Sequence, residues 1–252
     1  MSFCIAIKVQ DGLVGIADTR VTTGTQAITA RKVTSIQHDN HCMFLMTSGL
    51  RSARDKALTY FNEMLDEKDE KFTKVYEAVN AFGEQVRRVA DEDRKGLAES
   101  GLDFNLHVLI GGQLEADKEH KLYMLYPQAN WVEVSQGTPY YLIGESTYGK
   151  PILDRALTYD RPMDFALKVG HLAFDSTRRA ATDVDYPIDI VIYRKDSFRI
   201  IEHRYTHHDL QHIGDWWQEH LSDLIDELPS EWVDELMTHL QPPVVGRLPD
   251  AS

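Results

Sequence analysis

Positive charge is scarce in this sequence. Lys and Arg number 27 against 40 Asp and Glu, which leaves a formal net charge of −13 over 252 residues. A protein that binds nucleic acid needs a basic face to neutralise phosphates, so no DNA or RNA partner is expected. The same charge repels anionic membrane surfaces. No apolar run approaches the roughly 20 residues of a membrane-spanning helix, so no membrane association is expected either.

Cysteine is also scarce. The chain has only Cys4 and Cys42, each within an apolar segment typical of a strand. Two such residues predict buried free thiols rather than a disulfide framework, which suits a reducing compartment. A signal peptide is not expected, because Lys8 and Asp11 interrupt a first apolar stretch that is too short for one. We therefore expect a cytoplasmic protein.

The segments that are present alternate between strand and helix patterns. Hydrophobic residues make up 42% of the chain and aromatic residues 10%, which is enough for a substantial core. Alternating or continuous apolar runs predict strands, and apolar residues at helical spacing predict helices. The expected order is strands at 2–9, 13–20, 32–36 and 42–46, helices over 50–66 and 73–95, strands at 104–111, 121–126, 131–134 and 140–143, helices over 148–158 and 162–180, and strands at 188–193 and 198–203.

Local signals refine this order. Thr73 is expected to cap the second helix, Gly96 to end it, and Pro162 to occupy the first position of the fourth. Residues 21–31 are Thr-rich and are expected to form a loop or short irregular strands. By itself, the pattern indicates a mixed α/β protein and nothing narrower.

The first twenty residues carry the strongest signal. An apolar, β-branched segment up to Val9 turns at Gln10-Asp11-Gly12 and returns as a second apolar segment, which predicts a β-hairpin at the start of the chain. Ser2 is small enough for ordinary removal of Met1, which would leave a hydroxyl and a free α-amine on one residue. An amine that acts as base for its own side chain is a known way to activate a nucleophile.

These residues carry a family resemblance. Four features resemble the start of proteasome β-type subunits: Ser2 on the opening strand, Asp18-Thr19-Arg20 at the end of the second, Arg31-Lys32-Val33 after a loop, and the segment Thr47-Ser48-Gly49-Leu50. The length, the unprocessed start and the acidic C-terminal extension are similar to the bacterial proteasome-type proteases called Anbu. The resemblance covers roughly residues 2 to 203. It implies an α+β N-terminal-nucleophile (Ntn) hydrolase fold, an αββα four-layer sandwich over 1–206, with an acidic helical extension over 207–252.

The resemblance also implies catalytic roles. Ser2 would be the nucleophile and, through its amine, the base, with Asp18 and Lys32 as the supporting pair. An unperturbed α-amine has a pKa of about 7.7–8.0, and a neighbouring cation lowers it. Arg20 would lie next to the same pair, and the backbone N–H of Gly49 would donate to the oxyanion.

This sequence departs from the family pattern in two respects. Ser2 stands where the family has Thr. The distal Ser and Asp of the proteasome site are assigned to Ser146 and Asp183, with Glu145 and Asp185 as the respective alternatives. Tyr186-Pro187-Ile188 replaces the usual Ser-Gly-Gly after that Asp.

The resulting hypothesis is a proteasome-like hydrolase that cleaves peptide or amide bonds through Ser2 within a homo-oligomeric ring or open ring. Its partners would be a peptide or protein substrate and further copies of the chain, with room for an unidentified unfoldase. No metal or organic cofactor is expected. The alternatives are a narrow-specificity amidase or amide-transfer enzyme of the same fold, and a ring-forming scaffold with weak or no activity.

The segment 207–241 is acidic yet rich in Trp and Leu. Pro229 is expected to divide it into two short amphipathic helices. Helices of this kind need a surface to pack on, so we expect this extension to lie between neighbouring subunits. Folding back on its own domain is the alternative.

Overall fold

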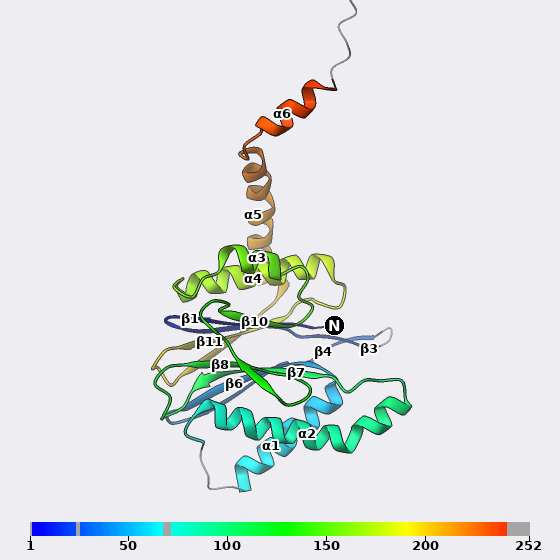
Figure 1. Cartoon of the computed structure of the whole chain (residues 1–252), viewed down its shortest axis with the longest axis vertical. Helices are drawn as coiled ribbons and strands as arrows, with labels where there is room; N and C mark the ends of the chain where they lie inside the picture. The colour runs from blue at the N-terminus through cyan, green and yellow to red at the C-terminus, as the bar shows by residue number, and fades with distance from the viewer. Residues whose placement is uncertain (1, 24–25, 68–71, 241–252) are drawn as a thin grey trace, which may run out of the picture. The chain divides into compact units, whose positions relative to one another are not determined.

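The computed structural model describes residues 2–23, 26–67 and 72–240 (Figure 1). The chain divides into two compact units, Met1–Leu210 and Gln211–Ser252. In the first unit, two five-stranded antiparallel sheets are stacked and a pair of helices covers the outer face of each (Figure 1). The expected four-layer αββα sandwich is therefore confirmed, and it replaces the less specific α/β pattern.

The first sheet contains the N-terminal strand in its interior. Its strands follow the order β10-β1-β2-β11-β12, with β10 at Tyr140–Gly144, β1 at Phe3–Val9, β2 at Gly12–Asp18, β11 at Ile188–Arg194 and β12 at Ile200–Tyr205. β1 and β2 pair from Val9↔Gly12 to Cys4↔Ala17, which confirms the predicted hairpin. All seven residues of β1 are buried, because α3 (Lys150–Ala156) and α4 (Met163–Ala180) cover one face of this sheet and the second sheet covers the other. The start of the chain is thus fixed in the sheet.

The second sheet follows the chain with only one long interruption. Its order is β5 (Val33–His38), β6 (His41–Gly49), β7 (Leu106–Gln113), β8 (Lys121–Leu125) and β9 (Trp131–Glu133). The apolar run at the centre of β6 is buried on both faces, as predicted. The Thr-rich segment after β2 forms a separate two-stranded ribbon of β3 (Arg20–Thr23) and β4 (Gln26–Thr29).

The helices differ from the predictions mainly at their ends. α1 (Arg51–Glu67) and α2 (Val75–Glu99) cover the second sheet, and α3 (Lys150–Ala156) and α4 (Met163–Ala180) cover the first (Figure 1). Gly96 does not end α2, which continues to Glu99; Gly101, with a φ of 72°, follows the end instead. Lys74 rather than Thr73 is the N-cap, and Pro162 caps α4 from outside the helix.

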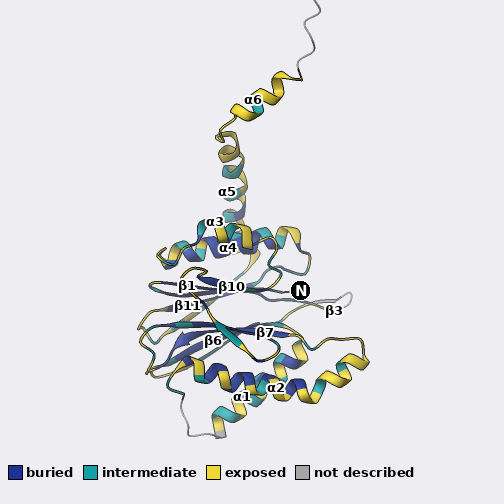
Figure 2. Ribbon diagram, in the orientation of Figure 1, coloured by how far each residue is buried: buried dark blue, intermediate teal, exposed yellow. Residues whose placement is uncertain are grey.

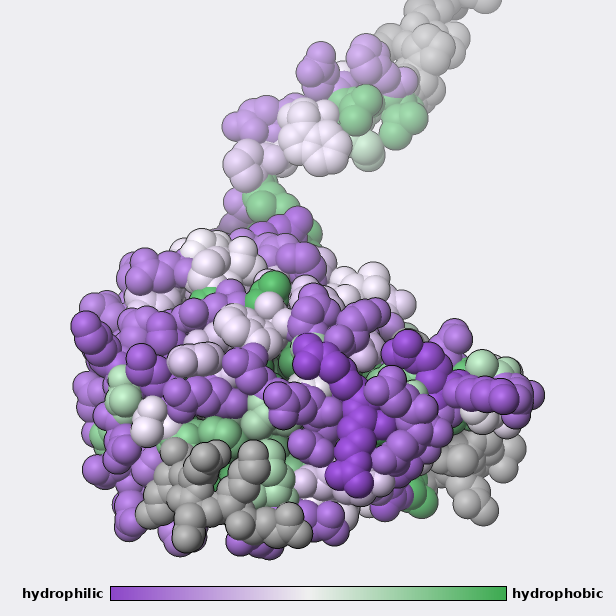
Figure 3. All heavy atoms as spheres, turned by 60° about the horizontal axis from the view of Figure 1, so that its bottom comes forward, coloured by the Kyte–Doolittle hydropathy of each residue, from purple (hydrophilic) through white to green (hydrophobic). Residues whose placement is uncertain are grey.

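Three buried clusters hold the layers together (Figure 2). Phe61 and Phe82 meet edge to face, with ring centroids 5.3 Å apart, between α1, α2 and the second sheet. Phe3 and Phe174 do the same at 5.8 Å between the first sheet and its helices. Phe44 packs in the cluster between the two sheets. Seen from the side of α1 and α2, hydrophilic residues cover most of the first unit (Figure 3).

The C-terminal extension contains α5 (His207–Asp226) and α6 (Glu231–Thr238). The predicted break around Pro229 is present, but α5 has 20 residues and is not short. Its first residues belong to the first unit, because Leu210 packs against the cluster under α3 and α4 and the His207 ring contacts Tyr186. Within the described ranges, no helix has both the length and the apolar character needed to cross a membrane.

Candidate active site

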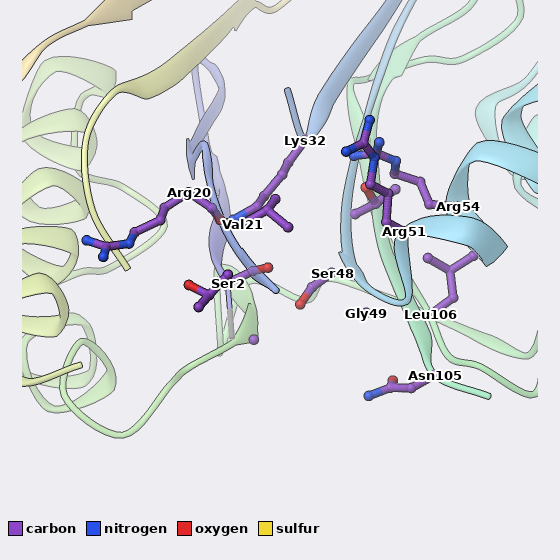
Figure 4. A pocket seen from close by; sticks show the side chains of 13 residues that line it. Ser2, Arg20, Val21, Lys32, Ser48, Gly49, Arg51, Arg54, Asn105 and Leu106 are labelled. Carbon is purple, nitrogen blue, oxygen red and sulfur yellow. Dashed lines mark hydrogen bonds between the residues drawn. The ribbon is translucent and has the colours of Figure 1, made fainter. Parts of the chain in front are cut away.

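A pocket of about 380 Å³ lies where strand ends from both sheets meet. Ser2 immediately precedes β1, Lys32 immediately precedes β5, Gly49 ends β6 and Gly144 ends β10. Figure 4 shows Ser2 on one side of this pocket and the start of α1 on the other. Its complete lining is Ser2, Arg20, Val21, Thr22, Lys32, Thr47, Ser48, Gly49, Arg51, Arg54, Asn105, Leu106 and Gly144.

The backbone around Ser2 is held from two directions. The carbonyl oxygen of Ser2 accepts a hydrogen bond of 2.7 Å from the N–H of Glu145. The next N–H in the chain, that of Phe3, donates to Asp18 Oδ1 at 2.7 Å. Gly144 has a φ of 91°, and a Cβ at this position would overlap the Ser2 carbonyl. Glycine is therefore required here for the chain to pass Ser2 so closely.

Lys32 and Asp18 form a buried ion pair beside Ser2. Lys32 Nζ lies 2.5 Å from Asp18 Oδ1 and 2.8 Å from the carbonyl oxygen of Arg20. The Asp18 side chain is 0% exposed and that of Lys32 4%. Burial raises the pKa of Asp18, and the positive charge of Lys32 and the hydrogen bonds from Lys32, Phe3 and Arg20 act against that rise.

Arg20 links this pair to the segment that precedes β11. Its N–H donates to Asp18 Oδ2 at 3.2 Å, and its Nη1 lies 3.1 Å from Asp185 Oδ2. Asp185 also accepts the N–H of Tyr186 at 2.9 Å. Asp183, in the same segment, is half-buried and lies near Thr22. Neither Asp183 nor Asp185 lines the pocket.

The turn after β10 contains Ser146 and Glu145, the two candidates for the distal Ser of the proteasome site. Ser146 is half-buried outside the lining, and its carbonyl accepts the N–H of Lys150 at 3.1 Å, at the start of α3. The carboxylate of Glu145 accepts the N–H of Thr147 at 2.9 Å, so its backbone, and not its side chain, bonds to Ser2. Of the six residues predicted as catalytic, Ser2, Lys32 and Gly49 line the pocket, and Asp18 is paired with Lys32. Ser146 and Asp183 lie outside the lining.

Gly49 has a backbone conformation that other residues rarely adopt. Its φ is 130°, and a Cβ there would overlap the carbonyl of Asn105. That carbonyl also accepts the N–H of Leu50 at 2.8 Å. The bend therefore brings the last residue of β6 to the wall of the pocket, where the backbone of Gly49 faces the same space as Ser2.

Sequence reasoning missed the residues opposite Ser2. Arg51 and Arg54 extend from the first turn of α1 and lie next to each other in Figure 4. Thr47 and Asn105 complete that side of the lining. The signal that could have identified the two arginines is their three-residue spacing, which begins two residues after Gly49, because residues three apart share a helix face.

Two other kinds of chemistry receive no support from the geometry. In the part of the chain that the structure describes, no three His, Cys, Asp or Glu residues are grouped closely enough to hold a metal ion. Cys4 lies near Ser2 in sequence, but it is a buried free thiol whose Sγ contacts the carbonyl of Thr47 at 3.7 Å. Burial raises the pKa of this thiol to about 12, which keeps it protonated and unreactive.

Comparisons with known proteins agree with this architecture. Residues 2–192 match the family model of the proteasome subunit. Anbu (ancestral beta-subunit) from Yersinia bercovieri is 33% identical, with a TM-score of 0.83 over 90% of this chain and 97% of that one. The structure described as the helical assembly of the Anbu complex from Pseudomonas aeruginosa is 31% identical, with a TM-score of 0.84 over 90% and 97% of the two chains.

A third structure, the Anbu (Gly-1) mutant from Hyphomicrobium sp. strain MC1, is 28% identical with a TM-score of 0.83 over 91% of this chain and 98% of that one. The comparison with curated proteins gives no match. Family model and structures together cover the site and both sheets. The chain therefore belongs to the proteasome subunit family and, within it, to the bacterial Anbu proteins.

Proposed function

We propose that this subunit is an N-terminal-nucleophile hydrolase that cleaves peptide or amide bonds through Ser2 once Met1 has been removed. The observation that carries the proposal is the position of Ser2 at a pocket that is also lined by Lys32, whose ammonium is paired with the buried Asp18. A hydroxyl, an amine on the same residue and a fixed cation nearby are the groups that this chemistry needs.

In the proposed reaction, the neutral α-amine of Ser2 takes the proton of its own Oγ as Oγ attacks the substrate carbonyl carbon. The Gly49 N–H stabilises the oxyanion of the tetrahedral intermediate. The protonated amine then gives its proton to the leaving nitrogen, the C–N bond breaks, and an ester to Ser2 remains. Water, deprotonated by the same amine, hydrolyses that ester and restores both groups of Ser2.

Lys32 and Asp18 tune this amine. The positive charge of Lys32 disfavours protonation of a neighbouring amine and so lowers its pKa, which leaves more of the base free at neutral pH. Asp18 holds the ammonium in place at 2.5 Å. Arg20 contributes by donating its N–H to Asp18 and by pairing with Asp185.

We assign positioning roles to Ser146 and Asp183. Ser146 belongs to the turn in which the N–H of Glu145 donates to the Ser2 carbonyl. The carbonyl of Ser146 itself accepts the N–H of Lys150, the first residue of α3. Asp183 lies near Thr22, which is part of the pocket wall. Both residues would act through these neighbours on the geometry around Ser2 rather than on the reacting atoms.

Assembly is part of the proposal. The relative from Pseudomonas aeruginosa is described as a helical assembly, so homo-oligomers occur in this family. We propose an open or closed ring of this chain in the cytoplasm, acting on a peptide or protein and served by an unfoldase of unknown identity. The extension with α5 and α6 would provide contacts between subunits.

Intact mass spectrometry with and without a β-lactone or epoxyketone probe tests the activity. The expected result is a mature chain that begins at Ser2 and gains one probe per subunit, with no gain in Ser2→Ala. Met1 retained in active material would defeat the mechanism. Absence of any labelling in the Met1-free chain would favour an inactive scaffold. Products formed with an added amine acceptor would identify an amide-transfer enzyme.

A further inference from the structure

The charges that line the pocket all have the same sign. Arg20, Lys32, Arg51 and Arg54 are its charged lining residues, and no acidic side chain is among the lining residues of this pocket. This contrasts with the chain as a whole, whose formal net charge is −13. A cationic pocket in an acidic protein indicates a ligand with negative charge, since the field of a lined cleft concentrates ions of the opposite sign.

The two sides of the pocket differ in how far their cations are neutralised. Lys32 is paired with Asp18 at 2.5 Å and Arg20 with Asp185 at 3.1 Å, one carboxylate for each cation. Figure 4 shows the Arg20 side chain pointing away from Arg51 and Arg54. The excess of positive charge therefore lies on the α1 side of the pocket.

There, Arg51 and Arg54 share a single carboxylate. Asp55 lies 2.6 Å from Arg54 Nη2 and 3.4 Å from Arg51 Nε. Arg54 is also fixed by a hydrogen bond of 2.9 Å from its Nη1 to the carbonyl of Arg31, and its side chain is only 14% exposed. Arg51 is 53% exposed. One guanidinium is thus held rigidly and its neighbour is open to the pocket, an arrangement suited to a planar carboxylate.

A buried hydroxyl points to the same kind of ligand. Thr47 is 4% exposed and lines the pocket, yet its Oγ1 makes no hydrogen bond with any residue that the structure describes. Buried polar groups in folded proteins are nearly always paired. A ligand that brings a hydrogen-bond acceptor into the pocket would complete this pairing.

On the basis of the proposed Ser2 hydrolase, we infer that the pocket selects peptides with a carboxylate side chain, Glu or Asp, at the residue whose carbonyl is attacked. The side chain enters between Ser2 and the arginine pair, where Arg51 and Arg54 bind its carboxylate. A Lys or Arg side chain at the same position meets like charge and is rejected.

Matched probes test this selectivity. Four acetyl-tripeptidyl epoxyketones that differ only in Glu, Gln, Leu or Lys at the reacting residue are compared by the rate at which each adds its mass to the chain. We expect the Glu probe to react at least about tenfold faster than its Gln isostere, equivalent to about 1.4 kcal/mol, with the Lys probe slowest. The Glu advantage should shrink as salt is raised.

Three variants locate the effect. Arg51→Glu alters an exposed side chain and should remove or reverse the preference for the Glu probe over its Gln isostere. Arg88→Glu makes the same charge change on the exposed surface of α2, outside the pocket, and should keep the preference. Thr47→Val removes a hydroxyl that no described residue uses and should lower the Glu rate more than the Leu rate.

The inference and the proposed function can fail separately. Equal rates for the Glu and Gln probes would overturn the inference and leave the Ser2 mechanism standing. Should no probe label Ser2, the proposed function fails, and binding of fluorescent Glu and Gln peptide amides, measured by anisotropy, decides the inference alone. Tighter Glu binding that Arg51→Glu abolishes supports it, and equal binding overturns it. If a Gln peptide with a free C-terminal carboxylate binds as tightly as the Glu peptide amide, the pocket recognises the carboxylate of a chain end and not that of a side chain.

Discussion

Lys32 Nζ lies 2.5 Å from Asp18 Oδ1, and both side chains are almost completely shielded from water, at 4% and 0% exposure. Removing one partner of such a pair leaves an uncompensated buried charge, which costs about 3–5 kcal/mol. Stability and catalysis are therefore coupled at this site, and a single substitution at Lys32 would perturb both. A double mutant is needed to separate them.

The first prediction uses that double mutant. Lys32→Met should lower the free energy of unfolding by about 3–5 kcal/mol because Asp18 loses its counterion. Adding Asp18→Asn should recover much of this loss in thermal or urea unfolding, since the charge has gone and the amide oxygen still accepts from Phe3. Labelling of Ser2 should stay far below the wild-type rate in both variants. Labelling restored along with stability would show that the pair is only structural.

The pH profile of Ser2 labelling gives the second prediction. An unperturbed α-amine has a pKa of about 7.7–8.0, and only its neutral form acts as base. A neighbouring Lys32 lowers that pKa, so the labelling rate should rise with pH and reach half of its plateau below that range. Any residual rate in the Lys32→Met, Asp18→Asn double mutant should reach its half-plateau at higher pH. Identical profiles would remove Lys32 from the mechanism.

Gly144 supplies the third prediction. In Gly144→Ala the new Cβ overlaps the Ser2 carbonyl, and a φ of 91° strains any L side chain. The strain is about 1–3 kcal/mol, and relief requires Ser2 to move from the Glu145 N–H. We expect labelling to fall by more than tenfold while the protein stays folded. Gly137→Ala is the control, since nothing crowds its Cβ; equal labelling in the two variants would contradict the prediction.

The thiols give the fourth prediction. Burial raises the pKa of Cys4 to about 12 and that of Cys42 to about 11, so the thiolate that reacts with alkylating agents is nearly absent at pH 8. Iodoacetamide should leave both residues unmodified in the native protein and modify both in urea. Native alkylation of Cys4 at its unfolded rate would contradict the burial and would make Cys4 a rival target for electrophilic probes.

The part of the site that could be predicted from sequence was encoded locally. The Asp-Gly turn predicted the β1–β2 hairpin, and that hairpin brings Asp18 to the N–H of Phe3. By contrast, the sequence context of Lys32 taken alone is that of an exposed strand lysine. In the folded chain its side chain is buried and contacts Asp18 and the carbonyl of Arg20, and such non-local contacts leave no signature in a window of neighbouring residues.

The remaining misses have the same physical origin. Arg51 and Arg54 face the pocket because the opposite face of α1 packs its apolar residues on the second sheet, and the direction of a helix face depends on that packing. Gly96 was expected to end α2, but the apolar stripe and the cap at Ser100 and Gly101 outweigh the roughly 1 kcal/mol that an internal glycine costs. Tertiary contacts therefore determined the end of α2 and the direction of the α1 face, where local propensity was weak.

The last prediction concerns the extension formed by α5 and α6. Trp216 is 55% exposed and Trp232 66%. Leu236 follows Trp232 by four residues, on the same face of α6, and is also exposed, as are Met237 and Leu240, which lies just past the end of the helix. Large exposed apolar patches mark interaction sites or lead to aggregation. A covering surface has to come either from another subunit, as we propose, or from the first unit of the same chain.

Truncation after Leu210 distinguishes an interface between subunits from folding back on the same chain. Leu210 still packs against the core, so the cut leaves that contact intact. If the extension joins subunits, light scattering should show a smaller particle while circular dichroism shows that the sandwich remains folded. Trp232→Ala with Leu236→Ala should weaken assembly in the same direction. Asp164→Ala, an exposed change on α4, serves as the control. A truncated protein that is soluble, folded and of unchanged size would rule out the interface, since subunits that assemble without the extension cannot depend on it.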